Sequence, residues 1–256
     1  MRYEVLGSLS VTDGGKSLAV TAPKMEVVLA ALLIRADQVV SVDQLVTEMW
    51  GGSRPRRATA ALYVYVSQLR KLLTGRTGTA GPIVTRTPGY VLRTGSDELD
   101  LHEFQRLVRE GRQHMRRDEY ELASRAFESA LGLWRGPALS ELREGPIING
   151  FAIWLDEVRL ECHEMLVETN LRLGRHREMV SLLHELIQDH PLHEAFYRQL
   201  MLALYRSERR ADALAVYQSA RAALNKELGL EPGRHLREMQ RSVLAAADVL
   251  DVRPAV

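Results

Sequence analysis

The spacing of apolar residues beyond residue 96 constrains this chain more than any other feature of its sequence. Apolar residues recur there three and four positions apart, which is the period of an α-helix with one buried face. Glycine and proline breaks separate the segments with this period, which are 101–108, 120–134, 151–173, 178–187, 195–205 and 211–228. The pattern predicts that residues 97–256 fold into packed helices, with a domain boundary near residue 96.

A weak internal repeat lies within the helical part. Its members are Ala123 with Phe127 and Ala130, Met179 with Leu183 and Leu186, and Ala213 with Tyr217 and Ala220. The interval from Met179 to Ala213 is 34 residues, the tetratricopeptide period, whereas the interval from Ala123 to Met179 is 56 residues. Tetratricopeptide-like repeats and an irregular helical bundle therefore both stay open. Either arrangement gives stacked helix pairs that bind partners and supply no chemistry of their own.

The first 96 residues have a mixed pattern. Pro23 suits the first turn of a helix, and Ser41 with Gln44 has the spacing of a capping box. The expected elements are strands at 4–11 and 18–21 around a turn at 12–15, helices at 25–34 and 42–50, a loop at 51–57, a connection at 74–82, and a hairpin of strands 83–86 and 90–93. A smaller α+β part therefore precedes the helical one, and the chain is mostly α.

Charge is distributed unevenly between the two parts. Residues 1–95 hold 12 lysines and arginines against six acidic residues, whereas residues 96–256 hold 22 against 27. No acidic residue lies between Glu48 and Asp97, although eight basic residues do. A phosphate backbone attracts the first part and repels the second, so the asymmetry favours nucleic-acid binding by the N-terminal part.

The stretch ALYVYVSQLRKLL, residues 61–73, has a strand-like composition in its first half but the period of a helix throughout. One apolar stripe runs along it, made of Leu62, Val66, Leu69 and Leu73. The opposite face is polar and nearly uncharged, as a surface for base edges would be, and comprises Ala60, Tyr63, Val64, Ser67 and Gln68. Arg70 and Lys71 follow in the last turn, where they could take flanking phosphates.

Signals for catalysis or ligand binding are weak. Gly15-Lys16-Ser17 resembles the end of a phosphate loop but lacks the earlier glycine that such a loop requires. His184, His190 and His193 have no cysteine or paired carboxylate at a metal-ligand spacing. The single cysteine, Cys162, fits a reducing cytoplasm, and no apolar run approaches the roughly 18 residues of a membrane span. We expect no enzyme, no cofactor, no metal and no membrane partner.

Several segments, taken in order, resemble known families. VYVSQLRKLL (64–73) and IVTRTPGYVL (83–92) are similar to the recognition helix and the wing of OmpR-type winged-helix DNA-binding domains. The segments that resemble the bacterial transcriptional activator domain are ALGLWRGPAL (130–139), RLECHEMLVETNLRLGRH (159–176), HPLHEAFYRQLMLALYRSERRADALAVYQSAR (190–221) and LGLEPG (228–233). Together they cover almost the whole chain, which is thus similar to the Streptomyces antibiotic regulatory protein (SARP) family.

The resemblance implies both a fold and a function. The fold would be a winged helix-turn-helix at residues 1–96, followed by a tetratricopeptide-like activator domain at residues 97–256. The function would be transcriptional activation of an antibiotic biosynthetic gene cluster. Such a protein binds direct repeats in double-stranded promoter DNA near the −35 region and recruits RNA polymerase through its sigma factor. Direct repeats imply two protomers side by side, in head-to-tail order.

The resemblance also assigns roles to residues. Ala60, Tyr63, Val64, Ser67 and Gln68 would face the major groove, and Arg70 and Lys71 would hold the DNA backbone. Arg86, with Thr87 beside it, would enter the minor groove, where narrow A/T tracts attract arginine. Tyr90 would pack the wing against the core. Arg54, Arg56 and Arg57 lie in a loop with two candidate partners, DNA phosphate and polymerase.

One departure from the family pattern affects base readout. Relatives often carry a charged residue where Ser67 and Gln68 stand. Direct contacts would therefore favour adenine through Gln68 or thymine methyl groups through Val64 and the tyrosines. A different class of function also stays open, namely an interaction scaffold whose helical part binds a protein while its basic part tethers it non-specifically to nucleic acid. Preference for promoter DNA over random DNA distinguishes the two classes.

Overall fold

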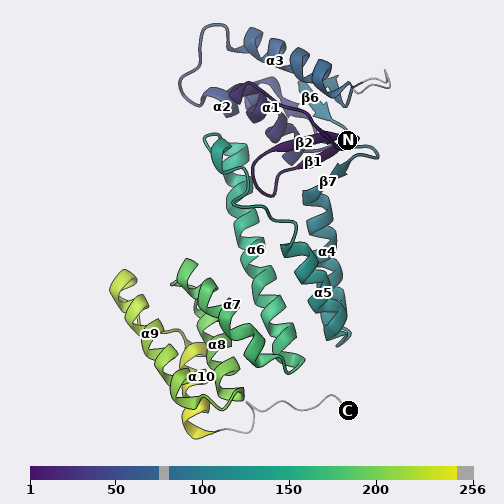
Figure 1. Cartoon of the computed structure of the whole chain (residues 1–256). Coiled ribbons are helices and arrows are strands. Elements are labelled where there is room, and N and C mark those ends of the chain that lie inside the picture. The colour runs from purple at the N-terminus through teal and green to yellow at the C-terminus, as the bar shows by residue number, and fades with distance from the viewer. Residues whose placement is uncertain (75–80, 247–256) are drawn as a thin grey trace. The chain divides into compact units, whose positions relative to one another are not determined.

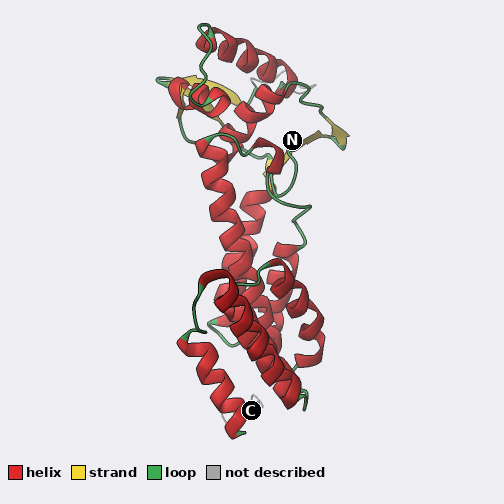
Figure 2. Cartoon of the chain, turned by 90° about the vertical axis from the view of Figure 1, so that its left-hand side faces the viewer, coloured by secondary structure: helices red, strands yellow, loops and turns green. Residues whose placement is uncertain are grey.

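The computed structural model describes residues 1–74 and 81–246 of the chain. Within these ranges the chain forms two compact units, of which the first comprises the described residues of 1–108 and 129–160 and the second those of 109–128 and 161–246. Helices dominate both units, and within the described ranges strands occur only in the first (Figure 1, Figure 2). The prediction of a mostly α chain with an α+β start is confirmed. The predicted connection at 74–82 lies largely outside the described residues.

The first unit contains two small sheets. In one, β1 (Arg2–Glu4) lies between β2 (Ser10–Asp13) and β7 (Glu98–Leu99), with β3 (Lys16–Ser17) at the edge beyond β2. Strand β1 is antiparallel to β2 and parallel to β7. The other sheet has the order β4-β6-β5, with β4 at Val40–Ser41, β6 at Gly89–Leu92 and β5 at Ile83–Arg86. The second sheet contains the predicted hairpin.

The N-terminal strands differ from the prediction of a single strand over residues 4–11. Strand β1 ends at Glu4 and β2 begins only at Ser10. The reason is that the Val5 and Leu6 amides donate to the Asp100 carboxylate, at 2.9 and 3.0 Å. These two amides therefore do not pair with a neighbouring strand. The predicted strand at 18–21 is also wrong, because β3 comprises only residues 16–17 and helix α1 begins shortly afterwards at residue 23.

Three helices build the core of the N-terminal part, namely α1 (Pro23–Ile34), α2 (Val42–Trp50) and α3 (Ala58–Leu73). Helix α1 starts with Pro23 in its first turn, as predicted. Ser41 caps α2, since its hydroxyl accepts from the Gln44 amide at 3.1 Å while the Gln44 side chain accepts from the Ser41 amide at 2.9 Å. This confirms the capping box. Helix α1 packs against both α2 and α3 and is buried along most of its length.

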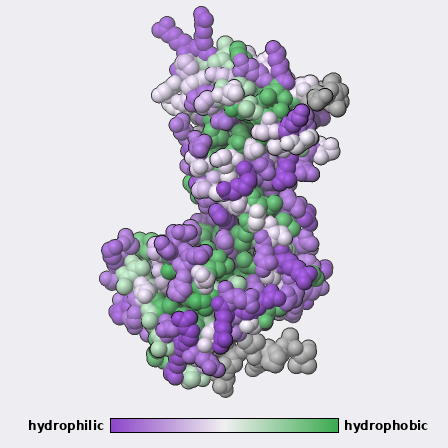
Figure 3. Space-filling view, viewed as in Figure 1, coloured by the Kyte–Doolittle hydropathy of each residue, from purple (hydrophilic) through white to green (hydrophobic). Residues whose placement is uncertain are grey.

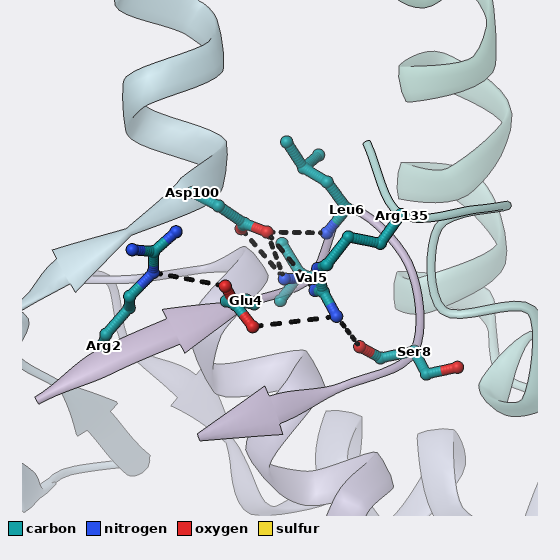
Figure 4. Close-up of polar contacts among 7 residues, drawn as sticks. All are labelled: Arg2, Glu4, Val5, Leu6, Ser8, Asp100 and Arg135. Carbon is teal, nitrogen blue, oxygen red and sulfur yellow. Dashed lines mark hydrogen bonds and ion pairs between the residues drawn. The ribbon is translucent and has the colours of Figure 1, made fainter. Parts of the chain in front are cut away.

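Residues 4–8 are held by contacts from two later segments of the same unit (Figure 4). Asp100 begins helix α4 (Asp100–Met115) and is 7% exposed. The Arg135 amide donates to the Leu6 carbonyl at 2.8 Å, and its guanidinium lies 3.7 Å from both the Glu4 and Asp100 carboxylates. The same guanidinium donates to the Ser8 carbonyl at 3.3 Å. Burial raises the pKa of Asp100, although the amide hydrogen bonds and Arg135 act in the opposite direction.

A second buried carboxylate joins α2 to helix α6 (Pro146–Arg172). Glu48, near the end of α2, is 2% exposed and accepts from the Ile147 amide at 2.7 Å and the Ile148 amide at 2.9 Å. Gly145 permits this approach, because a Cβ at that position would lie 2.7 Å from the Glu48 carbonyl oxygen. Helix α6 therefore starts at Pro146, earlier than the predicted 151, since Pro146 occupies the first turn and does not act as a breaker.

The remaining elements are α5 (Tyr120–Leu131), the short 3₁₀ helix η1 (Ser140–Leu142), α7 (His176–Asp189), α8 (Glu194–Arg206), α9 (Arg210–Leu228) and α10 (Arg234–Ala245). In the second unit α7 packs on α8, α8 on α9, and α10 on both α8 and α9. Six of the predicted repeat positions are fully buried, namely Ala123, Phe127, Ala130, Leu183, Ala213 and Ala220. Helix α10 lies outside the helices predicted from the sequence, because most of its residues are polar and only Leu236 and Val243 are buried.

Candidate nucleic-acid interface

Helix α3 has one face in the core and one in solvent. Its apolar stripe is buried as predicted, with exposures of 0% for Leu62, 1% for Val66, 0% for Leu69 and 1% for Leu73. The ambiguous stretch 61–73 is therefore a helix. Burying four aliphatic side chains, at about 1.5–3 kcal/mol each, outweighs the modest strand preference of its β-branched and aromatic residues.

The outward face of α3 carries the five residues that the sequence predicts for base contacts. Tyr63 is 52% exposed and Val64 is 55% exposed, so two neighbouring apolar side chains lie open to solvent on this face. Ala60, Ser67 and Gln68 are exposed on the same helix, and Lys71 is exposed in its last turn. The structure thus brings the predicted major-groove set together on one face. Whether that face contacts bases stays a prediction.

The three arginines of the loop before α3 have two different environments. Arg54 turns back onto α2, where its guanidinium donates to the Thr47 hydroxyl at 2.5 Å and the Asp43 carbonyl at 3.3 Å. Arg56 and Arg57 are exposed, and no partner for either guanidinium is found within residues 1–74 and 81–246. Arg54 is therefore engaged within the domain, while Arg56 and Arg57 are available to a partner.

The start of α3 adds to the positive character of this loop. Its first turn contains no acidic residue and no side chain caps it, so the positive end of the helix dipole faces the loop. Hydrophilic side chains project from the region of the first unit that holds α3 and this loop (Figure 3). The absence of any acidic residue between Glu48 and Asp97 means that nothing in this segment opposes an approaching polyanion.

The hairpin of β5 and β6 forms the wing. Arg86 ends β5 opposite Gly89, and both Arg86 and Thr87 are exposed near the turn. Strand β4 supports the turn from behind, since Ser41 pairs with Gly89 and the Val42 amide donates to the Pro88 carbonyl at 3.2 Å. A Cβ at residue 89 would lie 2.7 Å from the Ser41 Cα, so only glycine allows this packing. The wing is thus fixed at its tip to the start of α2.

Arg70 has a different environment from the one predicted for a phosphate contact. Its Nε donates to the Ile83 carbonyl at 2.9 Å and its Nη2 to the Thr85 hydroxyl at 2.8 Å. Its guanidinium lies over the Tyr90 ring, 5.5 Å from the centroid. Tyr90 is 8% exposed, as expected for a residue that packs the wing. Burial and the nearby Tyr63 raise the pKa of Tyr90, whereas Arg70 lowers it.

Sequence reasoning missed two residues that shape this surface. Thr85 holds Arg70, but an isolated threonine in a strand carries no signal of such a contact. Glu48 joins α2 to α6, and here a signal exists. A carboxylate in the last turn of a helix opposes the helix dipole, so it indicates a stabilising partner elsewhere in the fold.

Within residues 1–74 and 81–246, no group of three or more His, Cys, Asp or Glu residues is arranged to hold a metal ion. Within the same ranges, no helix combines the length and apolar character needed to cross a membrane.

The fold and this surface define a winged-helix transcription regulator with a helical activator domain. The profile of the domain "Transcriptional regulatory protein, C terminal" matches residues 15–92, and that of the "Bacterial transcriptional activator domain" matches residues 99–244. The chain belongs to the Streptomyces antibiotic regulatory protein family of transcriptional activators. This is a family of regulators and not of enzymes.

Individual relatives agree with this assignment. Regulatory protein DnrI of Streptomyces peucetius is 37% identical over 257 residues, covering 98% of this chain and 94% of DnrI. Transcriptional regulator RedD of Streptomyces coelicolor is 34% identical, covering 100% of this chain and 74% of RedD. The solved structure of Mycobacterium tuberculosis EmbR, in complex with a low-affinity phosphopeptide, matches with a TM-score of 0.91 and 34% identity. That match covers 96% of this chain and 65% of the EmbR chain.

Proposed function

We propose that this activator binds direct repeats in double-stranded promoter DNA near the −35 region and controls an antibiotic biosynthetic gene cluster. Residues 1–96 would form the DNA-binding domain and residues 97–256 the activator domain. Two protomers would bind side by side in head-to-tail order, in the cytoplasm at the nucleoid. The observation that carries the proposal is the outward face of α3, where Tyr63 and Val64 are about half exposed beside a wing that presents Arg86.

The chemistry of the α3 face supports reading of A·T base pairs. Gln68 can accept from and donate to the adenine edge in a bidentate pair, and Val64 can pack against a thymine methyl group. Ala60 and Ser67 are small, which lets the helix approach the floor of the groove. Tyr63 offers both an apolar ring and a hydroxyl at the same surface.

Phosphate contacts would position this face without reading sequence. Lys71 is exposed at the end of α3, and no ion pair engages it in the described part of the chain. Arg86 and Thr87 at the wing would enter the adjacent minor groove, where a narrow A/T tract concentrates negative potential. These contacts would supply most of the salt dependence of binding.

Recruitment of RNA polymerase through its sigma factor would use the loop at 51–57. Arg56 and Arg57 are the exposed, unengaged members of this loop, whereas Arg54 is bound to α2. Phosphate is the alternative partner of the two free arginines. Activated transcription and DNA binding, measured on the same variant, distinguish the two partners.

The test is footprinting with the full chain on DNA that flanks its own gene, followed by titration of the protected sequence and a random duplex of equal length. We expect a protected pair of direct repeats and tighter binding to that sequence. Equal affinity for both duplexes would reject sequence-specific activation and favour the tethered scaffold. Tyr63→Ala and Gln68→Ala should reduce the preference for the protected sequence more than they reduce affinity for random DNA. Equal losses on both duplexes would assign these two residues to folding.

A further inference from the structure

Helix α3 has two basic residues in its last turn, and the side chain of one of them, Arg70, is held by another element. Its Nε donates to the Ile83 carbonyl at 2.9 Å, its Nη2 donates to the Thr85 hydroxyl at 2.8 Å, and its planar group covers the Tyr90 ring. All three partners belong to the wing, which consists of β5 and β6. Its neighbour Lys71 is exposed and has no such contacts in the described chain.

The contact with Thr85 bears directly on Arg86. Neighbouring side chains on a strand point to opposite faces. When Arg70 holds the Thr85 hydroxyl toward α3, it therefore also sets the face from which the Arg86 side chain leaves the strand. Thr85 pairs with Tyr90 across the hairpin, so the hydroxyl and the ring that Arg70 touches lie on the same rung. The guanidinium thus spans both strands of the wing.

We propose that Arg70 is a positioning residue, which acts on DNA through the wing and does not bind a phosphate. It fixes the spacing between the base-reading face of α3 and Arg86, so that both reach adjacent grooves of the duplex together. Arginine suits this task because its planar, forked group can make two directed hydrogen bonds while it stacks on an aromatic ring. The inference rests on the proposed function, since it takes Arg86 as a DNA contact.

A double-mutant cycle between Arg70 and Arg86 tests the proposal, because coupled residues have non-additive effects. The proteins are full-length wild type, Arg70→Ala, Arg86→Ala and the double variant, titrated on the footprinted DNA at several salt concentrations. We expect Arg86→Ala to weaken binding about 5- to 150-fold and to lower the salt slope by about one. In the Arg86→Ala background, Arg70→Ala should change the dissociation constant less than about twofold and leave the salt slope unchanged.

Two further variants guard against loss of folding as an explanation. Thr85→Val removes the hydroxyl acceptor while keeping the shape of the side chain and the charge of Arg70. It should weaken binding and show no additional effect when combined with Arg70→Ala. Arg70→Lys keeps the positive charge but lacks the planar fork that makes both hydrogen bonds while it stacks on Tyr90, so it should behave like Arg70→Ala. Lys71→Ala is the matched control, and its effect should be the same in the wild-type and Arg86→Ala backgrounds.

The opposite results would overturn the inference. The double variant could instead lose affinity by the product of the two single fold-losses, with a salt slope lower by about two. That result would show that Arg70 contacts phosphate itself. Retention of affinity by Arg70→Lys, or by Thr85→Val, would lead to the same conclusion. These outcomes leave the proposed function intact. That function fails separately, when wild-type protein binds the footprinted and random duplexes equally.

Discussion

Replacement of Glu48 should destabilise the first unit far more than replacement of a solvent-exposed acidic residue on the same helix. Its carboxylate, 2% exposed, accepts the Ile147 and Ile148 amides at 2.7 and 2.9 Å. A hydrogen bond to a charged group contributes about 1.5–3 kcal/mol. Glu48→Ala removes two such bonds and leaves two donors unpaired at the start of α6. From these contributions we expect a loss of about 3–5 kcal/mol in the free energy of unfolding.

Glu48→Gln provides an intermediate case. The amide keeps one acceptor oxygen, so one of the two hydrogen bonds survives in a neutral and weaker form. Its NH₂ group would face the other backbone amide, so two hydrogen-bond donors would oppose each other without an acceptor between them. The expected loss is about 1.5–3 kcal/mol, which places this variant between wild type and Glu48→Ala.

The assay is urea unfolding followed by circular dichroism, together with hydrogen exchange at the Ile147 and Ile148 amides. Exchange at these amides should accelerate in both variants, because the acceptor that protects them has changed. Asp43→Ala is the matched control, since Asp43 lies on the same helix with its side chain 90% exposed and makes only a 3.8 Å ion pair with Arg54. A loss below about 0.5 kcal/mol for Glu48→Ala, or unchanged exchange at both amides, would refute the reasoning.

Other perturbations have equally specific outcomes. Gly89→Ala should lower the free energy of unfolding by about 1–3 kcal/mol, because the new Cβ would overlap the backbone of β4. Urea unfolding measures this loss, and an unchanged midpoint would contradict the close packing of Gly89 on β4. Burial lowers the pKa of His176, which also begins α7, so its neutral form is favoured in the folded state. The resulting stability is present above the unfolded pKa of about 6.5 and is lost as pH falls through the folded pKa. Unfolding measured from pH 7.5 to 5 should therefore show a smaller acid loss for His176→Gln than for wild type, and parallel curves would remove His176 as a cause. The double variant Arg56→Ala, Arg57→Ala should keep its affinity for promoter DNA while in vitro transcription falls; a matching loss of affinity would assign the loop to phosphate.

The elements that the sequence predicts well are those with local causes. The capping box of α2 needs only Ser41 and Gln44, three residues apart, and the structure contains both hydrogen bonds. The helix at 58–73 can be predicted from its own apolar stripe, because this period is visible without knowing which residues pack against it. The exposed face of α3 is the geometric complement of that stripe, so the predicted base-reading residues could be placed from the sequence as well.

The features that the sequence does not reveal depend on distant partners. Residues 4–11 look like one strand, yet the segment after Glu4 is irregular because Asp100 takes its amides. The contacts of Arg70 with Ile83 and Thr85 are likewise not visible in the sequence pattern, because they join α3 to a separate hairpin. In both cases a polar group about 13 or more residues away along the chain decides the outcome, and periodicity carries no information about such pairs.

The late position in the chain of the partners of β1 has a consequence for how the protein is made. Strand β7 joins β1 from residues 98–99, and the loop after β1 obtains its last partners when Arg135 and Leu139 donate to the Leu6 and Gly7 carbonyls. Because these partners come from residues 98–139, we expect the N-terminal strand to complete its contacts only after that segment has been synthesised. A chain that ended near residue 96 would lack β7, so β1 would become an edge strand of this sheet. Truncation near residue 96 would therefore deprive the N-terminal segment of its partners at Leu99, Asp100, Arg135 and Leu139.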